Sequence, residues 1–465
     1  MTTDNEEIRQ ERVYSGATQR DNRTHYQRDR DRILYTPAFR RLGGVAQVVH
    51  VSTERGYHNR LTHSLKVAQV GRRLAESLQH TTDSKTIQEA GGLNEDVVET
   101  ACLAHDLGHP PFGHPAEAAI QAEIDSEDGF EGNPQSFRIV NNVAIHKQPY
   151  GESHRGLDLT LASLNAILKY PWQRNTTGKK NSKWGYYATE QFEFTRTQEL
   201  RTPGTDSQRK SLEASIMDWA DDLTYAIHDL VDFYKAGLIP LDELIRNSAE
   251  QEVVLTEFED DYDGAIDKWD GTGFLERFLP GLAKVATTSE EQSTFANQLD
   301  TPFRSSSTEQ AVVSFISSEM IERYLGQWDE VDVKVDPGIQ GGLDIDPILE
   351  HEIEFLQFLS EYYVFNDPAL LAQQEGHRKI VTELFDLLLR AAKEDGASRG
   401  LLPPPFDEKI DRIDEDNLGY SDIEAETLRN RVVADIIASM TEQQAMELYE
   451  RITGRSPGLV TDRII

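Results

Sequence analysis

The ten residues His105-Asp-Leu-Gly-His-Pro-Pro-Phe-Gly-His114 interrupt a part of the chain that is otherwise helical in pattern. The two prolines have no amide hydrogen to donate, and the two glycines, Gly108 and Gly113, favour turns, so a helix cannot continue through them. We therefore expect a helix to end here, and we expect the three histidines of this stretch to face a shared cleft.

Outside this stretch, His63 and Asp221 are also of residue types that bind metal ions, as are His105 and Asp106 within it. Each of the four lies inside or at the edge of a helical stretch, so a fold can bring them to one point. Imidazole and carboxylate together suit a divalent ion such as Mn, Fe, Co, Ni, Zn or Mg, with positions left for water and phosphate oxygens. A single histidine or His-Asp pair is more often ordinary surface chemistry, and it is the additional neighbouring histidines that favour a hydrolytic metal site.

Apolar residues recur mainly at helical spacing. Between residues 61 and 78 an apolar side chain falls at roughly every fourth position, as a helix that faces a core requires, and residues 212–230 and 353–363 behave in the same way. A further stripe is brought to an end by Gly396 and Gly400. The two stripes consist of Leu61, Leu65, Val70, Leu74 and Leu78, and of Val381, Leu384, Leu387 and Leu388. Because strand-like alternation is scarce, the sequence predicts an all-α fold.

A few segments depart from this pattern. Residues 39–50, and Val45-Ala-Gln-Val-Val49 in particular, suggest a short extended stretch or a hairpin. Acidic, turn-rich segments suggest surface loops, and Pro403-Pro404-Pro405 marks a connection before the last helical segment. The expected loops are residues 257–264, 287–291 and 329–347.

The chain carries 47 basic and 81 acidic residues, a formal net charge of −34 over 465 residues. Such an exterior repels itself in dilute buffer and does not attract nucleic acid or anionic lipid. In strong brine the repulsion is screened, because the Debye length falls to ~3 Å at 1 M salt. We infer a salt-adapted, halophilic cytosol. High charge with low hydropathy is also a signature of disorder, but the long periodic apolar segments favour a folded chain.

The single cysteine, Cys102, excludes an intrachain disulfide and fits a reducing interior. Nothing near it in the sequence would activate a thiolate, which indicates a small buried residue rather than a nucleophile. The N-terminus has no positive region followed by an apolar one, and no apolar run reaches membrane-spanning length. We therefore expect a cytoplasmic protein with no membrane partner.

Four motifs, in their order along the chain, resemble those of the HD-superfamily deoxynucleoside triphosphate triphosphohydrolases, the dGTPase-like enzymes. They are Arg60-Leu-Thr-His63, the stretch 105–114, Phe130-Glu-Gly-Asn-Pro-Gln-Ser-Phe-Arg138 and Ala220-Asp-Asp-Leu-Thr-Tyr225. The similarity extends to Leu168-Lys-Tyr-Pro171, Ile227-His-Asp-Leu-Val-Asp232 and, more loosely, Ala438-Ser-Met-Thr441, and is weakest over residues 250–345. The resemblance implies an HD-domain helical fold with extra C-terminal helices and acidic surface insertions. The expected division is a catalytic core in residues 1–245, a variable acidic insertion in 246–348, and a C-terminal helical region in 349–465 that packs on the core.

The resemblance implies one divalent ion, Mg, Mn or another transition metal, held by His63, His105, Asp106 and Asp221. Asp222, the neighbour of Asp221, is the competing ligand. Tyr225 and Asp229 follow Asp221 at i+4 and i+8, on one helical face, whereas Asp222 projects about 100° away. The spacing and the family pattern both favour Asp221.

His114 and Glu117 are spaced i, i+3. A carboxylate one turn away can orient an imidazole and keep it protonated, as a general acid requires. The resemblance places this pair beside the scissile bond, with His114 protonating the 5′ oxygen of the leaving nucleoside and Glu117 as its partner. The alternative is that His114 is a structural hydrogen-bonding residue in a tight turn.

The remaining expected contacts are with the substrate. Arg60, one helical turn before His63, can reach the α-phosphate with its guanidinium fork. The resemblance implies that Lys169, Tyr170 and Asn133 bind the triphosphate and that His109 touches a phosphate or lines the cleft. It also implies that Gln47 and Asp229 bind the 3′-hydroxyl and that Tyr225 packs under the sugar. The chain departs from the family pattern at Val45-Ala46, where relatives commonly carry Lys and Thr.

These features predict hydrolysis of a deoxynucleoside triphosphate to a deoxynucleoside and tripolyphosphate. One alternative is an HD phosphatase or phosphodiesterase acting on other nucleotides, and another is a nucleotide-sensing or nucleic-acid-binding protein with a vestigial site. The arginines that could form a basic patch are Arg28, Arg30, Arg32, Arg40 and Arg41. Pairing of these arginines with the interleaved Asp29 and Asp31 is the favoured interpretation. The resemblance further implies a homo-oligomer and, in some relatives, a nucleotide effector, while the base preference is not indicated.

Overall fold

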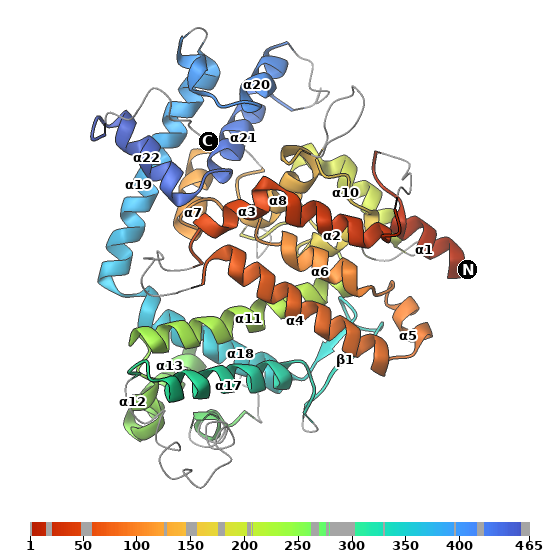
Figure 1. Cartoon of the computed structure of the whole chain (residues 1–465), viewed down its shortest axis with the longest axis vertical. Coiled ribbons are helices and arrows are strands. Elements are labelled where there is room, and N and C mark those ends of the chain that lie inside the picture. Colours follow the sequence, from red (N-terminus) through yellow and green to blue (C-terminus); the bar gives the residue numbers. More distant parts are fainter. Residues whose placement is uncertain are drawn as a thin grey trace. The chain divides into compact units, whose positions relative to one another are not determined.

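The computed structural model is almost entirely helical in its described residues (Figure 1), which confirms the all-α prediction. The described residues are 2–14, 21–47, 58–124, 128–145, 156–174, 182–201, 206, 208–261, 269–275, 279, 303–328, 331–394, 397–415 and 423–456. The chain forms two compact units. Unit 1 comprises Met1–Asp218, Gln340–Gly342 and Ala372–Ile465, and unit 2 comprises Trp219–Ile339 and Leu343–Leu371. These limits differ from the expected boundaries near residues 245 and 348, and the three-part division stays a prediction.

Unit 1 holds most of the helices. Its α-helices are α1 (Thr2–Gln10), α2 (His25–Tyr35), α3 (Pro37–Arg41), α4 (Arg60–Thr81), α5 (Ser84–Glu89), α6 (Glu95–Ala104), α7 (His114–Glu123), α8 (Gly132–Arg138), α9 (Leu161–Ile167), α10 (Gln191–Thr197), α20 (Phe406–Asp414), α21 (Ala425–Ala438) and α22 (Glu442–Ile452). Its shorter turns are the 3-10 helices η1 (Leu42–Gly44), η4 (Ala188–Glu190), η5 (Gln198–Leu200) and η8 (Ala397–Leu401), and the π-helix η2 (Ile139–Val143). Helix α11 (Leu212–Ala236) begins in unit 1 and continues into unit 2, and α19 (Pro368–Lys393) begins in unit 2 and continues into unit 1.

Helix α4 packs against α6, and α6 packs against α2 (Figure 1). Helix α6 also packs against α9. A capping box fixes the first turn of α4: the Asn59 side chain accepts from the amide of Thr62, and the Thr62 hydroxyl accepts from the amide of Asn59. Its buried stripe contains His63, Val67, Val70, Leu74 and Leu78. The sequence predicted that Leu61 and Leu65 also face the core, and this part of the prediction was wrong. Leu65 is 46% exposed and Leu61 is half-buried. Leu65 follows the buried His63 by about 200° around the helix, so it must face away from the core.

The C-terminal helices of unit 1 share a core with α7. Apolar residues of α7, such as Ala116 and Ile120, pack in one cluster with residues of α19, α20, α21 and α22. In α19 the buried positions are Val381, Leu384 and Leu388, as predicted, whereas Leu387 is only half-buried and Phe385 is buried in addition. This cluster places the C-terminal helices behind the helix that carries His114.

Unit 2 contains the rest of α11 and a group of helices around an aromatic core. Its further elements are α12 (Leu241–Arg246), α13 (Ser248–Asp261), α14 (Gly271–Gly273), α17 (Ser307–Tyr324), α18 (Pro347–Ser360), the π-helix η7 (Glu361–Phe365) and strands β1 (Val333–Val335) and β2 (Leu343–Ile345). The ring of Phe258 lies against those of Trp269 and Phe355, with centroid distances of 5.5 and 5.3 Å respectively. The buried Arg323 guanidinium donates to both oxygens of Glu352, at 2.9 and 2.7 Å.

Three of the predicted irregular segments need correction. Most of residues 39–47 are helical, in α3 and η1, and only Ala46 forms an extended bridge, with Asn59; residues 48–50 lie outside the described part of the chain. Helix α13 continues to Asp261, so the expected loop at 257–264 is helical at its start. The expected loop at 329–347 contains an antiparallel hairpin, with Val333 opposite Ile345. Its strands are three residues each, too short to give a periodic signal.

Other expectations agree with the structure where they can be followed. Cys102 is fully buried, and Pro403–Pro405 fall between η8 and α20. The expected loop at 287–291 lies outside the described residues. Among the residues described, none of the helices has both the length and the apolar character that crossing a membrane requires.

Candidate active site

The stretch 105–114, here called the histidine loop, joins α6 to α7 in unit 1. Helix α6 ends at Ala104 and α7 begins at His114, as the prolines and glycines predicted. Gly113, the residue before α7, has φ +62°, a conformation that favours glycine. Phe112 before it also has a positive φ, +70°, and its ring stacks on that of His377 with centroids 4.2 Å apart. Two such residues in succession reverse the chain and present His114 at the start of the new helix.

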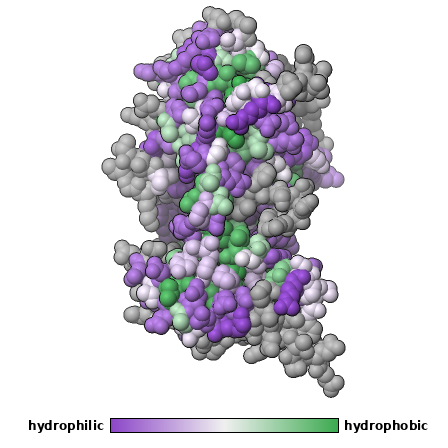
Figure 2. All heavy atoms as spheres, turned by 90° about the vertical axis from the view of Figure 1, so that its left-hand side faces the viewer, coloured by the Kyte–Doolittle hydropathy of each residue, from purple (hydrophilic) through white to green (hydrophobic). Residues whose placement is uncertain are grey.

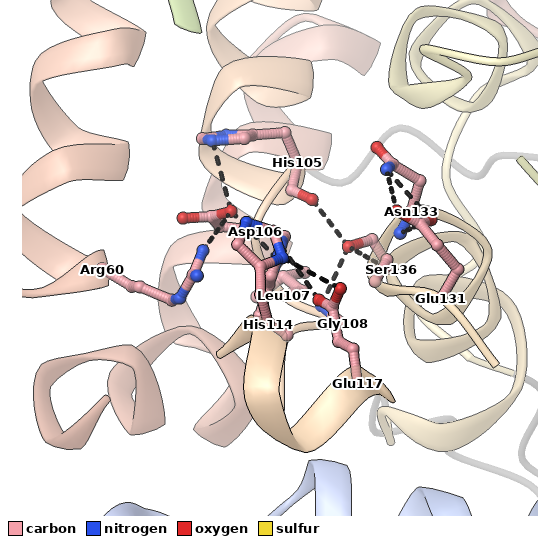
Figure 3. A network of polar contacts seen from close by, with 12 residues as sticks. Arg60, His105, Asp106, Leu107, Gly108, His114, Glu117, Glu131, Asn133 and Ser136 are labelled. Atoms are coloured by element: carbon pink, nitrogen blue, oxygen red, sulfur yellow. Dashed lines mark hydrogen bonds and ion pairs between the residues drawn. The ribbon is translucent and has the colours of Figure 1, made fainter. Parts of the chain in front are cut away.

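His105 and Asp106 lie at the end of α6, close to Arg60 of α4 (Figure 3). His105 Nδ1 lies 2.6 Å from the carbonyl oxygen of Cys102, which can only accept a hydrogen bond, so Nδ1 carries the proton and Nε2 carries the lone pair. The rings of His63 and His105 lie edge to face, with centroids 5.6 Å apart. Both imidazoles are buried, which suits ligands of a shared ion.

Asp106 is buried and surrounded by positive or polar groups. Its Oδ1 accepts from Arg60 Nη1 at 2.9 Å and lies 3.1 Å from His109 Nδ1 and 3.6 Å from His105 Nε2. Burial alone would raise the pKa of Asp106, but Arg60, His105 and His109 hold that pKa well below its usual range. Its Oδ2 is buried and has no hydrogen-bond partner among the described residues. An ionised carboxylate with one unsatisfied oxygen beside two imidazoles fits a divalent cation.

Glu117 connects the other two histidines of the loop. Its Oε2 accepts from His114 Nδ1 at 3.1 Å, and its Oε1 lies 3.3 Å from His109 Nε2. Burial raises the pKa of Glu117, but His109, His114 and then Lys183 outweigh burial and hold the pKa below the usual value. Burial and the Arg60 charge lower the pKa of His109. The His114 side chain is 69% exposed, so it can reach a bound molecule while Glu117 orients it from behind. These three residues are also close enough together to hold an ion.

Helix α8 closes the site on the side of Glu117. The Ser136 hydroxyl accepts from the amide of Gly108 at 2.8 Å and donates to the carbonyl of His105 at 2.7 Å (Figure 3). A Cβ atom on Gly132 would lie 2.8 Å from Glu117 Oε1 and 3.0 Å from the His109 ring. Position 132 therefore has to be glycine if Glu117 and His109 are to keep their places.

Asn133 and Lys183 meet at Glu131, the residue before α8. The Asn133 side chain donates to both oxygens of Glu131, at 2.9 and 3.0 Å, and Lys183 donates to Glu131 at 2.6 Å. Lys183 is 40% exposed and is one of the charges that lower the pKa of Glu117. Asn133, an expected phosphate contact, thus lies at the site but is engaged with Glu131.

Lys169 and Tyr170 follow α9 and lie beside a second lysine. Lys169 pairs with Asp218 at 2.6 Å, and Lys210 pairs with the other oxygen of the same carboxylate. The Lys210 ammonium lies 5.7 Å from the centroid of the Tyr170 ring. The two lysines and one aspartate leave a net positive charge next to Tyr170.

The expected residues on α11 lie in unit 2. Asp221 comes three residues after Asp218 on this continuous helix, and Tyr225 and Asp229 follow one and two turns later. Asp229 is buried, and burial raises its pKa well above the usual value although Tyr225 hydrogen-bonds to it. In unit 1, Gln47 is half-buried, and its buried Oε1 has no hydrogen-bond partner in the part of the chain that is described. The approach of Asp221, Tyr225 and Asp229 to the residues of unit 1 stays a prediction.

Most of the arginines that could have formed a basic patch make ion pairs or hydrogen bonds with other residues of the protein. Arg30 pairs with Asp96 and Glu99, and Arg32 donates to the carbonyl oxygens of Leu157 and Asp158. The predicted pairing with the interleaved aspartates holds in part, because Arg30 lies 3.8 Å from Asp31, whereas Asp29 binds Arg12 instead of a neighbouring arginine.

Arg41 belongs to the site, which the sequence analysis missed. Its Nη2 donates to the carbonyls of Leu107 and His109, at 2.8 and 2.9 Å, and burial lowers its pKa to about 9. Ser136, Glu131 and Lys183 were missed as well. Ser136 and Glu131 fall inside the motif 130–138, so a closer reading of that motif would have found them, whereas Arg41 and Lys183 carry no local signal.

Comparison with known proteins agrees with this geometry. Residues 60–226 match the HD domain, and residues 343–451 match the phosphohydrolase-associated domain. The protein is therefore an HD-domain phosphohydrolase. It is 32% identical to a deoxyguanosinetriphosphate triphosphohydrolase-like protein of Corynebacterium efficiens, over 94% of this chain and 93% of the relative. The corresponding protein of Streptomyces coelicolor is 33% identical over 94% of each chain, and that of Shewanella loihica is 29% identical over 95% of each. The chain belongs to the family of deoxyguanosinetriphosphate triphosphohydrolase-like proteins, which confirms the resemblance seen in its motifs.

Proposed function

We propose that this protein hydrolyses deoxynucleoside triphosphates, dGTP among them, to a deoxynucleoside and tripolyphosphate. The observation that carries the proposal is the arrangement of the histidine loop. One end of the loop offers a buried Asp106 oxygen beside His63 and His105, and the other offers an exposed imidazole, His114, held by Glu117. A cation site next to a proton donor is what cleavage of a phosphoester bond requires.

A divalent ion held by His63, His105, Asp106 and Asp221 would lower the pKa of a bound water and draw charge from the phosphoryl group. Its identity, Mg, Mn or another transition metal, is open. The remaining work falls to side chains of the protein. Arg60 orients Asp106 and offers a positive charge to the α-phosphate, and His109 lies between Asp106 and Glu117.

Cleavage breaks the bond between the α-phosphorus and the 5′ oxygen, while a new bond forms from water to that phosphorus. His114 supplies the proton that the leaving 5′ oxygen needs, and Glu117 keeps the imidazole oriented toward the substrate. Positive side chains stabilise the negative charge on the phosphate oxygens as water attacks the α-phosphorus. Lys169 and Tyr170, with Asn133 and the newly found Lys183, form this anion-binding part of the site.

Recognition of the deoxyribose falls to Gln47, Asp229 and Tyr225 in this proposal. The buried Gln47 Oε1 and the buried Asp229 carboxyl, whose raised pKa favours its protonated form, both suit a hydroxyl group. Leaving such a buried polar group unmatched costs ~1–3 kcal/mol, which is enough to discriminate against a sugar without a 3′-hydroxyl. The Tyr225 ring under the sugar would clash with the 2′-hydroxyl of a ribonucleotide.

The test is product analysis at high KCl with Mn or Mg. Each of the four deoxynucleoside triphosphates is supplied singly and then as a mixture, so that activation by a second nucleotide is also seen. Release of tripolyphosphate by the wild type, and not by His105→Ala, supports the proposal and ranks the bases. Orthophosphate or a nucleoside monophosphate as the product would point to an HD phosphatase or phosphodiesterase, and binding without turnover would point to a sensing role.

The setting of the enzyme is part of the proposal. The charge of −34 supports a cytoplasmic protein adapted to high salt, for which nucleic acid is not the main ligand. Figure 2 shows hydrophilic side chains over much of the described surface on one face, with apolar side chains in small groups between them. Exposed apolar side chains such as Tyr35 and Phe192 are candidates for contacts in a homo-oligomer, which sedimentation at high KCl would detect.

A further inference from the structure

The carboxylate of Glu442, the first residue of α22, holds two separate segments of unit 1 together. It is 5% exposed, and its Oε1 accepts from the amide of Ala46 at 2.9 Å and from the amide of Phe112 at 3.3 Å. Ala46 and Phe112 are 66 residues apart in the chain, so this single oxygen links two backbone segments that are distant in sequence.

Each of these segments carries a residue of the proposed site. Ala46 directly precedes Gln47, which is proposed to bind the 3′-hydroxyl of the sugar. Phe112 lies two residues before His114, the proposed proton donor, and it has the positive φ that turns the chain toward His114. A non-glycine residue with positive φ is held in place only by its contacts, and the Glu442 carboxylate supplies the contact to its amide.

Arg41 strengthens the same connection from the other side. Its Nη1 donates to the carbonyl of Met440 at 3.1 Å, while its Nη2 donates to two carbonyls of the histidine loop. Residues 440–442 are therefore bound to the loop twice, once through a guanidinium and once through a carboxylate. Glu442 also lies in the first turn of α22, where the helix dipole stabilises a negative charge.

We propose that Glu442 is a positioning residue that sets the distance between the sugar-binding segment at Gln47 and the proton donor His114. This inference rests on the proposed function for the roles of those two residues. Through Glu442, the phosphohydrolase-associated domain contributes to sugar selectivity and to the rate of bond cleavage without touching the substrate. A displacement of about 1 Å at a reacting group can cost ~100-fold in rate, so loss of the shared acceptor should be visible in both properties.

The experiment compares Glu442→Ala with Glu442→Gln in the full-length enzyme at high KCl. Glu442→Gln keeps an oxygen that can accept from both amides, so kcat should stay within about threefold of the wild type. Glu442→Ala removes the acceptor, so kcat should fall ~10- to 100-fold and the preference for deoxynucleoside triphosphates over their 2′,3′-dideoxy analogues, which lack the 3′-hydroxyl that Gln47 is proposed to bind, should shrink. Hydrogen exchange at the amides of Ala46 and Phe112 should become faster in Glu442→Ala only.

Two controls separate positioning from stability. Glu447→Ala removes an exposed carboxylate from the same helix and should change nothing. Leu448→Ala destabilises α22 by removing a buried side chain of the apolar cluster in unit 1. If Leu448→Ala, at an equal loss of thermal stability, lowers kcat and selectivity as much as Glu442→Ala does, the role of Glu442 is only structural and the inference fails.

The exchange measurement also separates this inference from the proposed function. A wild-type enzyme that cleaves no deoxynucleoside triphosphate would overturn the proposed function, yet faster exchange at both amides in Glu442→Ala would still support the positioning role. Unchanged exchange at the two amides would overturn that role even in an active enzyme.

Discussion

Glu117 has two carboxylate oxygens and two histidine partners, His109 and His114, and each oxygen serves one of them. An amide in its place would offer one acceptor and one donor, so it could not accept hydrogen bonds from both imidazoles. The negative charge beside the His114 imidazole would be lost as well.

We therefore expect Glu117→Gln and His114→Gln each to lower kcat by ~10²- to 10⁴-fold, the usual contribution of general acid catalysis. Both variants should still bind metal, because neither residue is among the proposed ligands. Steady-state kinetics and metal analysis after gel filtration provide the measurement. His80→Gln, at an exposed position on α4, is the matched control. Full activity of His114→Gln would remove His114 from the mechanism.

At the level of residues, the sequence predicted contacts that lie within one or two helical turns. His114 and Glu117 are three residues apart, and their hydrogen bond follows from the helix that starts at His114. Arg41 and Glu442 could not be predicted in this way. Their partners lie 66 and 68 residues away for Arg41 in the histidine loop, and 330 and 396 residues away for Glu442. Only the tertiary fold decides which carbonyls and amides such side chains meet.

At the level of elements, α8 approaches the histidine loop closely because Gly132 has no side chain. Adding a methyl group there would press on the Glu117 carboxylate and the His109 ring, both of which are side chains that can move. We expect Gly132→Ala to reduce kcat at least ~10-fold while stability changes little, because the displaced groups are those that orient His114. Kinetics and thermal unfolding of the same sample would show the two effects separately.

Gly376→Ala is the matched control for this change. Gly376 lies in α19 with open space around its Cβ position, so alanine there should leave activity unchanged and raise stability by ~0.5–1 kcal/mol. An active Gly132→Ala enzyme would mean that the approach of α8 does not hold Glu117 in place.

A buried group of charges joins η4, α8 and α21. Arg138 pairs with Glu190 at 2.7 Å and with Asp435 at 2.8 Å, and burial raises the pKa of Glu190 to about 7, although Arg138 opposes this. The folded protein therefore keeps this proton up to about pH 7, whereas the unfolded chain releases it near the ordinary value of 4.5. Protonated Glu190 therefore contributes to the free energy of unfolding. This contribution is fully present below pH 4.5 and is lost as the pH rises through 7.

We expect Glu190→Gln to remove this part of the pH dependence. Between pH 5 and pH 8 the free energy of unfolding of the wild type should fall by ~2 kcal/mol more than that of the variant. Urea unfolding at several pH values and constant KCl measures the difference. Glu199→Gln, at a more exposed position in η5, should behave as the wild type does, and equal slopes for Glu190→Gln and the wild type would show that Glu190 is ionised in the folded state.

The elements show where periodicity succeeds and where it fails. The central helices were predictable because buried positions recur over five or six turns in α4 and α11. The start of α4 was misjudged because the buried residue there is the polar His63, which a count of apolar residues ignores. The hairpin of β1 and β2 was missed because three-residue strands give too few positions for an alternation to show.

At the scale of the whole molecule, the charge of −34 was evident from composition alone, and its effect on stability can be measured directly. We expect the free energy of unfolding to rise steadily from ~0.1 M to ~2 M KCl, as the Debye length falls from ~10 Å to below ~3 Å. Glu252, Glu259 and Asp260 are exposed on α13. Changing these three residues to amides should lower the KCl concentration at which the protein reaches a given free energy of unfolding. Indifference to salt in thermal unfolding would contradict the inference of salt adaptation.

Many positive charges of this protein are buried in pairs, as at Arg9, Arg12, Arg60 and Arg138, while the excess of negative charge is left to the exterior. If the proposed function holds, a triphosphate must diffuse through a repulsive field before it reaches the cationic groups of the site. For most enzymes with anionic substrates, added salt weakens attraction and slows the encounter. Here screening should remove a barrier, so the association rate constant should rise with ionic strength. In the salt-adapted cytosol that we infer from the charge, dissolved salt would then aid substrate capture.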